Sequence, residues 1–576
     1  MINKSNSNEF KSILLLKIPF CRFPDSKIEE ENFRTKAPFR PIPSLALATL
    51  CGFLKKYKSI DYKINAIDVN IEAYTKPGVA IDYSAYPKLL EESIKNNSYD
   101  VLALSSMFVF NVKWVDIAVR LSRKYHPNAK IIIGGGYPTL FPERCLKEHE
   151  IDDVVIGEGE ATLLHLLNKY NKYHDSDFEE KFPFVSYATK NKDGEIQIIQ
   201  RDKKFLDVSY LPAPAWEYLN VKKYFKNSGD RTLPVEGSRG CPYNCSYCCT
   251  YLSWGRRIRY KKVDQIVKEL LETQEKFNPD CFHFVDDNLS FSKEWFKEFL
   301  NKLIDLGLPV KVDASNFSVK HIDEELVDLL IKADMNRVAM AVESGSKEIQ
   351  ERINKRLDFK KIEEAVAMVK SKNLPVHLCW MIGFPGETME QINQTFNFAR
   401  KLRAHSNQFL TVLPYPGTKL YEDAKEGGFL AFNDVDLDRF DNRKCEYLKS
   451  DEWNYEQIRE MIYDINIEIN FLNNPFLDTK EGEVNMLMFL EKLLLRLPEH
   501  VISHIIAGYI HKNKKDYAKC EMYYNSAVEL LNTNKVLNDT FAKYLLLNHP
   551  IINDFNKYLQ KNDIKIKGVK VKKIAN

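Results

Sequence analysis

Short runs of β-branched residues alternate with helical stretches along most of this 576-residue chain, and this alternation restricts the folds open to it. Two parallel strands need a connection of a dozen or more residues, and a helix usually provides it. Strands that alternate with helices therefore indicate a parallel sheet. In the first third the pattern predicts a doubly wound parallel sheet, with strands at 12–18, 62–68, 101–105, 130–134 and 153–156 and helices at 44–57 and 112–125. Further on the alternation returns, with strands expected at 234–237, 281–285, 310–314, 337–342, 376–382 and 409–413.

One predicted strand runs into three successive glycines, Gly134, Gly135 and Gly136. Ligands of open α/β sheets bind at the carboxyl ends of the strands. A backbone without side chains lets a bulky ligand approach closely, but glycines are also what a tight turn requires. The run therefore indicates either a ligand site or a turn.

A loop at residues 240–248 carries three cysteines, Cys241, Cys245 and Cys248, in a C-x3-C-x2-C spacing. Three thiolates on one loop can hold three irons of a [4Fe–4S] cluster and leave the fourth iron open to a substrate, whereas such clusters normally have four cysteines. A structural zinc site would also need four ligands, and Cys249 directly adjoins Cys248 and is poorly placed. The chain has eleven cysteines, eight of them scattered outside this loop, which does not resemble a disulfide framework. The loop favours a cluster with an open iron.

This spacing, with the aromatic Tyr247 directly before the last cysteine, resembles the signature of the radical S-adenosylmethionine (SAM) enzymes. The resemblance implies that Cys241, Cys245 and Cys248 are the metal ligands and that Tyr247 lies by the adenine of SAM. It also implies that SAM chelates the open iron through its amino and carboxylate groups, and that reduction splits SAM to a 5′-deoxyadenosyl radical. The central units would then form the family's partial (β/α)6 barrel, with its site at the C-terminal strand ends.

Polar and glycine residues follow the ends of several predicted barrel strands. In the radical SAM family, groups after the fourth strand lie near the ribose and methionine of SAM, and the backbone after the fifth strand touches adenine. The resemblance therefore implies cofactor-binding roles for Glu343, Ser344 and Gly383. Asp286 and Asp287 follow the second strand. A helix N-cap is the alternative for both aspartates and for Ser344. No general base is identified, and hydrogen abstraction does not need one.

Four segments upstream of the cysteine loop resemble, in their order, the cobalamin-binding domain that precedes many radical SAM barrels. They are Pro41-x-Pro43-Ser44-Leu45, Ser105-Ser106, Ile133-Gly134-Gly135 and Gly157-Glu158-Gly159-Glu160. The resemblance covers about residues 10 to 190. It implies cobalamin as a further cofactor, bound by Ser105, Ser106, Gly134, Gly135, Gly157 and Glu158.

One departure concerns the lower face of the cobalamin. Many cobalamin domains carry an Asp-x-His-x-x-Gly motif whose histidine replaces the lower axial base, but this chain reads Asp68-Val69-Asn70 and has no histidine before His126. The resemblance then implies a base-off cobalamin without a histidine ligand. The alternative is a domain that has lost its cofactor. His126 and His149 lie in polar sequence and are expected at the surface.

The predicted domains are a Rossmann-like cobalamin-binding domain at 1–190, a linker at 191–230, the radical SAM barrel at 231–430 and a helical accessory domain at 431–576. Residues 516–527 resemble the second helix of a tetratricopeptide unit, with Cys520 and Ala527 as small packing residues. Only one such unit is visible, whereas arrays usually need three or more. We expect the helical domain to pack against the barrel, with recognition of a peptide or partner as the other hypothesis.

Composition narrows the range of partners. The net charge of +3 is small for this length and argues against nucleic acid as the main partner. The apolar run at 13–16 is far too short to span a bilayer, which needs about 20 apolar residues. With the largely polar residues 1–10, this favours a cytoplasmic protein without a membrane span, where thiols stay reduced.

The order of a cobalamin-like domain and a radical SAM barrel resembles the cobalamin-dependent radical SAM enzymes. The resemblance implies a methyltransferase that acts on an unactivated carbon of a peptide or natural-product substrate, with methylcobalamin as the methyl donor. It also implies an electron donor such as flavodoxin or ferredoxin as a partner. Rearrangement, cyclisation or oxidation without methyl transfer is the first alternative. A non-catalytic cobalamin-binding or partner-binding protein is the second.

Overall fold

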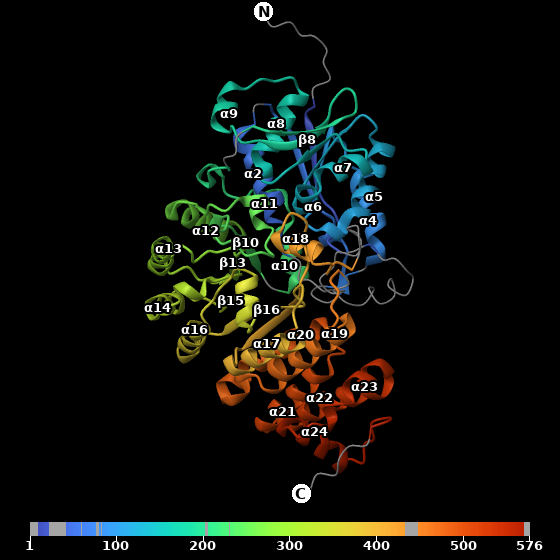
Figure 1. Ribbon diagram of the computed structural model, residues 1–576, viewed down its shortest axis with the longest axis vertical. Helices are drawn as coiled ribbons and strands as arrows, with labels where there is room; N and C mark the ends of the chain where they lie inside the picture. Colours follow the sequence, from blue (N-terminus) through green and yellow to red (C-terminus); the bar gives the residue numbers. More distant parts are fainter. Residues whose placement is uncertain are drawn as a thin grey trace, which may run out of the picture.

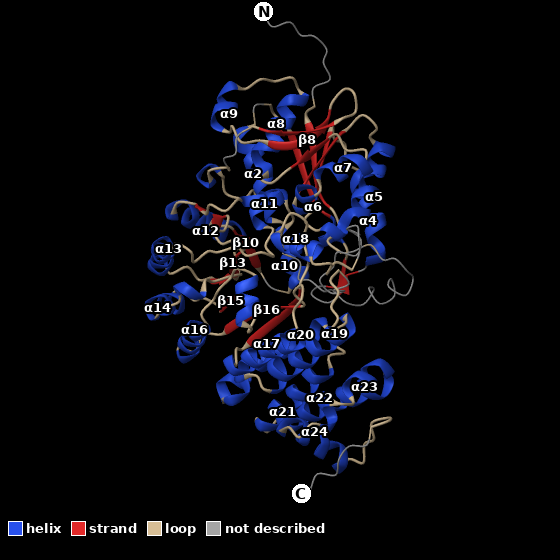
Figure 2. Ribbon diagram, in the orientation of Figure 1, coloured by secondary structure: helices blue, strands red, loops and turns tan. Residues whose placement is uncertain are grey.

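The computed structural model describes residues 10–21, 23, 42–58, 60–76, 80–81, 83–201, 205–229, 231–431 and 447–569. Three parts follow one another along the longest axis: a sheet covered by helices, an array of strands with helices outside it, and a bundle of helices (Figure 1). Figure 2 shows the strands gathered in the first two parts. This order confirms the predicted α/β class with a helical C-terminal region. Pro41 of the first cobalamin-like segment lies outside the described residues.

The N-terminal sheet has seven strands in the order β2-β1-β5-β6-β7-β8-β9. The first five are parallel, as predicted, whereas β8 and β9 are antiparallel additions at one edge that the sequence reading missed. The strands span Ser12–Lys17 (β1), Lys63–Asp68 (β2), Val101–Ser105 (β5), Lys130–Gly134 (β6), Asp153–Val155 (β7), Ser186–Lys190 (β8) and Ile196–Gln200 (β9).

Strand β1 is buried on both faces, which explains its unbroken run of apolar residues. Ile13 and Leu15 pack into one hydrophobic cluster. Leu14 and Leu16 pack into a second cluster on the other face of the sheet. Because helices cover both faces, no side chain in this run meets water. The helices are α2 (Leu45–Tyr57) and α8 (Gly159–Tyr170) on the first face, and α4 (Tyr86–Lys95) and α5 (Val112–Tyr125) on the second.

The central part contains six parallel strands in two groups of three, β10-β13-β14 and β15-β16-β17. Bridges from Val312 to Met335 and from Phe317 to Met340 join the two groups into one array. The last strand begins at Ser406 rather than at residue 409. The strands span Thr232–Val235, Cys281–Phe284, Lys311–Ala314, Val338–Glu343, Val376–Ile382 and Ser406–Thr411, and the outer helices include α12 (Val263–Phe277), α13 (Lys293–Leu306), α14 (Glu324–Lys332), α16 (Phe359–Ser371) and α17 (Met389–Leu402).

The connection between sheet and barrel packs closely against the N-terminal part. The Ala215 N–H donates to Ala48 O of α2 at 2.9 Å. A Cβ on Gly52 would lie only 2.8 Å from Ala213 O, so this position of α2 needs a residue without a side chain. The segment that contains Pro212 and Pro214 is therefore packed against α2. It leads into α10 (Val221–Ser228).

The C-terminal helices pack against the barrel, as expected. Asn470 Oδ1 accepts from the Asn407 N–H of β17 at 2.7 Å, and Asn474 Nδ2 donates to His405 O at 2.9 Å. No described helix is long and apolar enough to cross a membrane. The helices are α19 (Tyr455–Asn466), α20 (Lys480–Arg496), α21 (Val501–Asn513), α22 (Tyr517–Thr533), α23 (Lys535–Phe541) and α24 (Pro550–Lys561).

Helices α21 and α22 form the tightest pair of this bundle. A Cβ on Gly508 of α21 would overlap the ring of Tyr524 of α22, so the glycine sets how closely the helices approach. Cys520 and Ala527 are 7% and 0% exposed, as expected for small packing residues. Their membership of a tetratricopeptide unit stays a prediction.

Candidate active site

The three cysteines of the predicted cluster loop lie between β11 (Ser238–Arg239) and the short helix α11 (Thr250–Trp254). All three are partly exposed free thiols. Backbone bonds hold the middle of the loop on two sides. The Ser246 N–H donates to Ile353 O at 3.0 Å, and Ser246 O accepts from the Leu420 N–H at 2.9 Å. Two barrel segments from much later in the chain therefore fix the loop.

Two of the loop thiols have raised pKa values, and the arrangement of the three is compatible with an iron–sulfur cluster. Burial raises the pKa of Cys241 and of Cys245, and the neighbouring Cys248 raises both further. Their thiolates therefore need the positive charge of a metal beside them. Among the described residues, no group of three or more His, Cys, Asp and Glu side chains converges as ligands of one ion would. In a [4Fe–4S] cluster each thiolate binds a different iron, so convergence on one point is not required.

Tyr247 of this loop contacts Glu343, the last residue of β15. The Tyr247 hydroxyl donates to Glu343 Oε1 at 2.8 Å. Lys355 Nζ donates to the same oxygen at 2.9 Å and to the Tyr247 hydroxyl at 3.3 Å. A carboxylate and an ammonium side by side can accept from an amino group and donate to a carboxylate of one ligand. The arrangement is thus suited to the methionine end of SAM.

Lys355 is a site residue that the sequence reading missed. It lies in the turn after α15 (Lys347–Arg352), where no motif or hydrophobic period marks it. Burial alone would lower its pKa, but the Glu343 carboxylate and the thiols of Cys245 and Cys248 outweigh burial and raise the pKa above its ordinary value. Lys355 is therefore a cation at neutral pH.

The backbone at Glu343 aims its side chain. Its φ of 70° lies in the left-handed region, which is rare for a residue with a side chain. The pairing of β15 with β16 also shifts register between Ala341 and Glu343. Such irregularities redirect side chains and are often found next to active sites.

The other two residues predicted to bind SAM make local contacts. The Ser344 hydroxyl is fully buried, lies 3.1 Å from Thr395 Oγ1 and accepts from the Ser346 N–H at 3.1 Å. The helix-cap alternative for Ser344 is wrong, because Ser346 is the residue at the N-cap of α15. The Gly383 N–H donates to Glu387 Oε2 at 2.6 Å. Cofactor contacts of Ser344 and Gly383 stay predictions.

Asp286 and Asp287 are not helix caps either, because Ser292 caps the following helix, α13. Asp286 instead accepts from the Ser238 hydroxyl at 2.5 Å and from the Gly237 N–H at 3.1 Å. Burial raises the pKa of Asp286 to about 7 and that of Asp287 to about 6. Asp286 thereby ties the end of β13 to the segment that leads into the cysteine loop.

A cavity of about 380 Å³ lies where the carboxyl ends of the N-terminal strands face the barrel. This volume is within the range of small-molecule and cofactor sites. The barrel wall includes Glu236, Arg239, Trp254, Asp286 and Asp287. The sheet wall is mostly apolar side chains and glycines, and it includes four predicted cobalamin residues, namely Ser105, Gly134, Gly135 and Gly157. None of the described residues that line it is a histidine, and an apolar wall edged by glycines fits a large flat ligand.

Two of the glycines at this edge, Gly135 and Gly136, are required by the backbone itself. A Cβ on Gly135 would overlap Ser106 O, and a Cβ on Gly136 would overlap Met107 O. Gly135 also has a φ of 116°, which glycine tolerates best. Ser106, predicted to bind the cofactor, does not line the cavity, and its buried hydroxyl has no hydrogen-bond partner among the residues that the structure describes. The backbone at Gly135 and Gly136 therefore leaves no room for a side chain, and the glycine run also borders the cavity.

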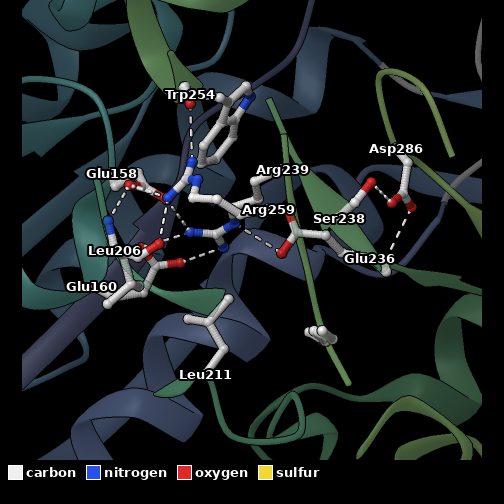
Figure 3. Close-up of polar contacts among 12 residues, drawn as sticks. Glu158, Glu160, Leu206, Leu211, Glu236, Ser238, Arg239, Trp254, Arg259 and Asp286 are labelled. Atoms are coloured by element: carbon white, nitrogen blue, oxygen red, sulfur yellow. Dashed lines mark hydrogen bonds and ion pairs between the residues drawn. The ribbon is translucent and has the colours of Figure 1, made fainter. Parts of the chain in front are cut away.

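Glu158, also predicted to bind the cofactor, is engaged elsewhere (Figure 3). Arg239 Nη1 donates to its Oε1 at 3.0 Å, Arg259 Nη1 donates to its Oε2 at 2.9 Å, and the Leu206 N–H donates to Oε2 at 2.8 Å. Both carboxylate oxygens therefore have protein donors. Contact between Glu158 and a cofactor stays a prediction.

The expected surface position of His149 is wrong. Its side chain is only 4% exposed and lies 3.7 Å from Asp116 of α5, because the chain after α7 (Pro142–Glu148) folds back onto that helix. Burial lowers its pKa. His126 is half-buried, and its Nε2 lies 3.0 Å from Ile94 O.

Polar side chains on the barrel strands form a second group that the sequence reading missed. On β16, Leu378 and Trp380 pack into the hydrophobic cluster, so His377 and Cys379 face the other way, into the barrel. His377 Nε2 lies 3.5 Å from Cys379 Sγ. Burial lowers the pKa of His377 to about 4, so the imidazole is neutral. The alternation of polar and apolar residues along β16 could have predicted this group from the sequence. His377 and Cys379 can both form hydrogen bonds with a substrate.

The protein is thus of an α/β class in which a glycine-edged parallel sheet faces a strand array that carries a three-thiol loop. The family model "Radical SAM superfamily" matches residues 235–399. The model "B12 binding domain" matches residues 41–167. The chain therefore belongs to the radical SAM proteins that carry an N-terminal B12-binding domain.

The chain is similar in sequence to several relatives and in fold to two solved structures. Cytidylyl-2-hydroxyethylphosphonate methyltransferase from Streptomyces wedmorensis is 26% identical over 81% of this chain and 92% of that protein. An anaerobic magnesium-protoporphyrin IX monomethyl ester cyclase from Cereibacter sphaeroides is 25% identical over 67% and 60%. The cobalamin-dependent SAM radical enzyme OxsB, with aqua-cobalamin bound, has a TM-score of 0.62 at 15% identity, covering 97% of this chain and 82% of that one. The radical SAM methyltransferase TsrM from Kitasatospora setae has a TM-score of 0.57 at 16% identity, covering 72% and 78%.

Proposed function

We propose that this protein is a cobalamin-dependent radical SAM methyltransferase that acts on an unactivated carbon of a peptide or natural product. The observation that carries the proposal is the cavity between the two matched domains, which has the glycine-edged sheet on one side and Trp254, Asp286 and Asp287 on the other. A bound cluster with SAM supplies a 5′-deoxyadenosyl radical, and bound methylcobalamin supplies a methyl group. The first cysteine of the loop comes two residues after Arg239 of the cavity wall, so a substrate in the cavity would have the radical source on one side and the methyl source on the other.

On the barrel side, Cys241, Cys245 and Cys248 would hold the cluster. Glu343 would accept hydrogen bonds from the amino group or the ribose of SAM, and Lys355 would donate to its carboxylate. The Glu343 and Lys355 side chains are 8% and 16% exposed, so these charge-assisted bonds are partly shielded from water. Asp287 and the other cavity residues would exclude water and orient the substrate.

On the sheet side, Ser105, Gly134 and Gly157 would contact the cobalamin, which would be base-off without a histidine ligand. Asn70, at the position of the usual histidine, supports this. Its Nδ2 donates to Ile18 O at 3.0 Å and to Asp68 Oδ1 at 2.7 Å, and its Oδ1 accepts from the Phe20 N–H at 2.9 Å. A side chain with these bonds is not free to reach a metal.

The substrate would be a small molecule or a peptide, and a low-potential donor such as flavodoxin or ferredoxin would supply the electron. The phosphonate methyltransferase relative matches over most of its length, so cytidylyl-2-hydroxyethylphosphonate is the first substrate to test. The cyclase relative supports the second candidate function, a radical cyclisation or oxidation without methyl transfer. The neutral His377 and Cys379 pair could serve either reaction by binding the substrate.

The test is anaerobic reconstitution followed by turnover with SAM carrying a labelled methyl group. We expect about four irons per chain, a cobalamin spectrum without a lower nitrogen ligand, release of 5′-deoxyadenosine and label in the product. Release of 5′-deoxyadenosine without label in the product would favour the cyclisation class. Failure to bind any cobalamin would reject the methyltransferase, and absence of 5′-deoxyadenosine would reject both enzymes.

A further inference from the structure

A buried network of charged side chains joins the N-terminal domain to the barrel (Figure 3). Arg239 of β11 lies at its centre, with a side chain that is 4% exposed. Its Nη1 donates to Glu158 Oε1 at 3.0 Å and its Nη2 to Glu160 Oε1 at 2.7 Å. Its Nε donates to Glu236 Oε2 at 2.9 Å. One guanidinium therefore binds two carboxylates of the N-terminal domain and one of the barrel.

A second guanidinium closes the network. Arg259 of β12 (Arg259–Tyr260), which pairs with β11, donates to Glu158 Oε2 at 2.9 Å and to Trp254 O at 2.9 Å. It also donates to Leu206 O. The Arg239 guanidinium lies 4.7 Å from the ring centroid of Trp254, which covers it. A buried charge with this many partners is costly to move, because any displacement leaves a charge unpaired.

The network is adjacent in sequence to both proposed cofactor sites. Glu158 and Glu160 flank the start of α8, directly after Gly157, which lines the cavity at the sheet edge. On the other side, Arg239 is followed by Gly240 and then by the first cysteine of the loop, Cys241.

Gly240, which follows Arg239, is packed closely against neighbouring backbone. Its φ is 90°, and a Cβ there would lie 2.6 Å from Arg257 O, so the chain at this point is confined by its own backbone. Ser238, on the other side of Arg239, is held by the buried Asp286 at 2.5 Å. Ser238 thus holds this segment to the barrel, and Arg239, the next residue, holds it to the N-terminal domain.

From this geometry we infer that Arg239 is a positioning residue that sets the separation of the iron–sulfur cluster and the cobalamin. The inference rests on the proposed function only for the presence of the two cofactors. A substrate radical formed at one site reacts with a group at the other only if the spacing is held, and such spacing is worth a large share of a rate enhancement. The carboxylates of Glu158 and Glu160 transmit the placement of the sheet edge to the first cluster cysteine.

A merely structural role makes a different prediction, and the chain offers a matched control. Lys261 and Glu269 form another buried ion pair at 2.9 Å, with side chains 3% and 5% exposed, but both partners belong to the barrel. Arg239→Gln and Lys261→Gln each remove a buried cation from a carboxylate. Only Arg239→Gln breaks a contact between the two domains.

The experiment measures electron paramagnetic resonance of the full chain loaded with cluster and cobalamin. Reduced cluster and cob(II)alamin are both paramagnetic, so each broadens the signal of the other in a way that depends on their separation. Iron and cobalamin contents are measured on every sample. We expect the same spin–spin broadening in wild type and Lys261→Gln, a changed broadening in Arg239→Gln at unchanged cofactor content, and partial recovery in Arg239→Lys.

The outcomes separate the hypotheses. Unchanged broadening in Arg239→Gln, or an equal change in Lys261→Gln, would overturn the inference. A wild-type chain that binds no cobalamin would reject the proposed function, and the inference with it, and the measured cofactor content distinguishes that failure from the first. If Arg239→Gln does not fold, Arg259→Gln tests the same network, because that side chain is 12% exposed and shares Glu158 with Arg239.

Discussion

The hydroxyl of Tyr247 donates a hydrogen bond of 2.8 Å to the carboxylate of Glu343, although the two residues are 96 positions apart. One belongs to the cysteine loop and the other to the end of β15. A hydrogen bond to a charged partner contributes about 1.5–3 kcal/mol. The hydrogen bond therefore links the cysteine loop to the second half of the barrel, and it brings the predicted adenine neighbour and the predicted ribose neighbour together beside the predicted thiolate ligands.

The first prediction concerns the cluster ligands. Cys245→Ala should lose the cluster and reduce 5′-deoxyadenosine release to background, because the loop supplies only three thiolates and the cluster needs all of them. Iron content and product release measure both effects. Cys249→Ala is the control, since Cys249 belongs to the start of α11 and is not expected to bind iron. Equal iron loss in the two variants would contradict the assignment.

The second prediction concerns Lys355. Lys355→Met should weaken SAM binding roughly tenfold or more, because a charge-assisted hydrogen bond to the SAM carboxylate is lost. Iron content should not change. The measurement is equilibrium binding of SAM to the reconstituted protein. Lys360→Met is the control, because the Lys360 side chain is 84% exposed on α16, and equal affinities in the two variants would argue against the role of Lys355.

The third prediction concerns pH. Burial raises the pKa of Glu387 to about 7, although the Phe384 and Gly383 N–H groups oppose the shift. The folded state then holds this proton more tightly than the unfolded state, so the stability from Glu387 is lost as pH rises from about 4.5 through 7. Glu387→Gln removes that loss.

The variant should therefore gain up to roughly 3 kcal/mol over wild type between pH 5 and 8. Anaerobic urea unfolding at the two pH values measures the difference. Glu390→Gln, at an exposed position of the following helix, should show no such gain. A stability difference between Glu387→Gln and wild type that does not vary with pH would show that the carboxyl titrates normally.

The fourth prediction separates a structural role of Asn70 from a ligand role. Asn70→Ala should lower the free energy of unfolding by about 1–3 kcal/mol, because the Phe20 N–H and the Tyr86 hydroxyl lose their acceptor. The spectrum of bound cobalamin should stay unchanged. Asn96→Ala, which removes an exposed amide, is the control for stability. A shifted cobalamin spectrum in Asn70→Ala would instead indicate that this amide approaches the metal.

The strands and the cysteine loop could be predicted from the sequence because their signals are local. Runs such as Ile13–Leu16 are apolar whatever the rest of the chain does, and the three cysteines are close together in sequence. Lys355 and Arg239 could not be predicted, because each acquires its role from a partner brought near by folding. Arg239 and Glu160 are 79 positions apart, and neither segment indicates the other as its partner.

The close crossing of Gly135 and Gly136 with the carbonyls of Ser106 and Met107 bears on how this protein can evolve. At that border the cavity is bounded by main chain, and a side chain introduced at either glycine would collide with it. Substitution of either glycine is therefore expected to disturb the backbone, and neither position is open to change. New substrate preferences should arise on the opposite side, at residues such as Trp254, where a change of side chain alters the shape without disturbing the crossing.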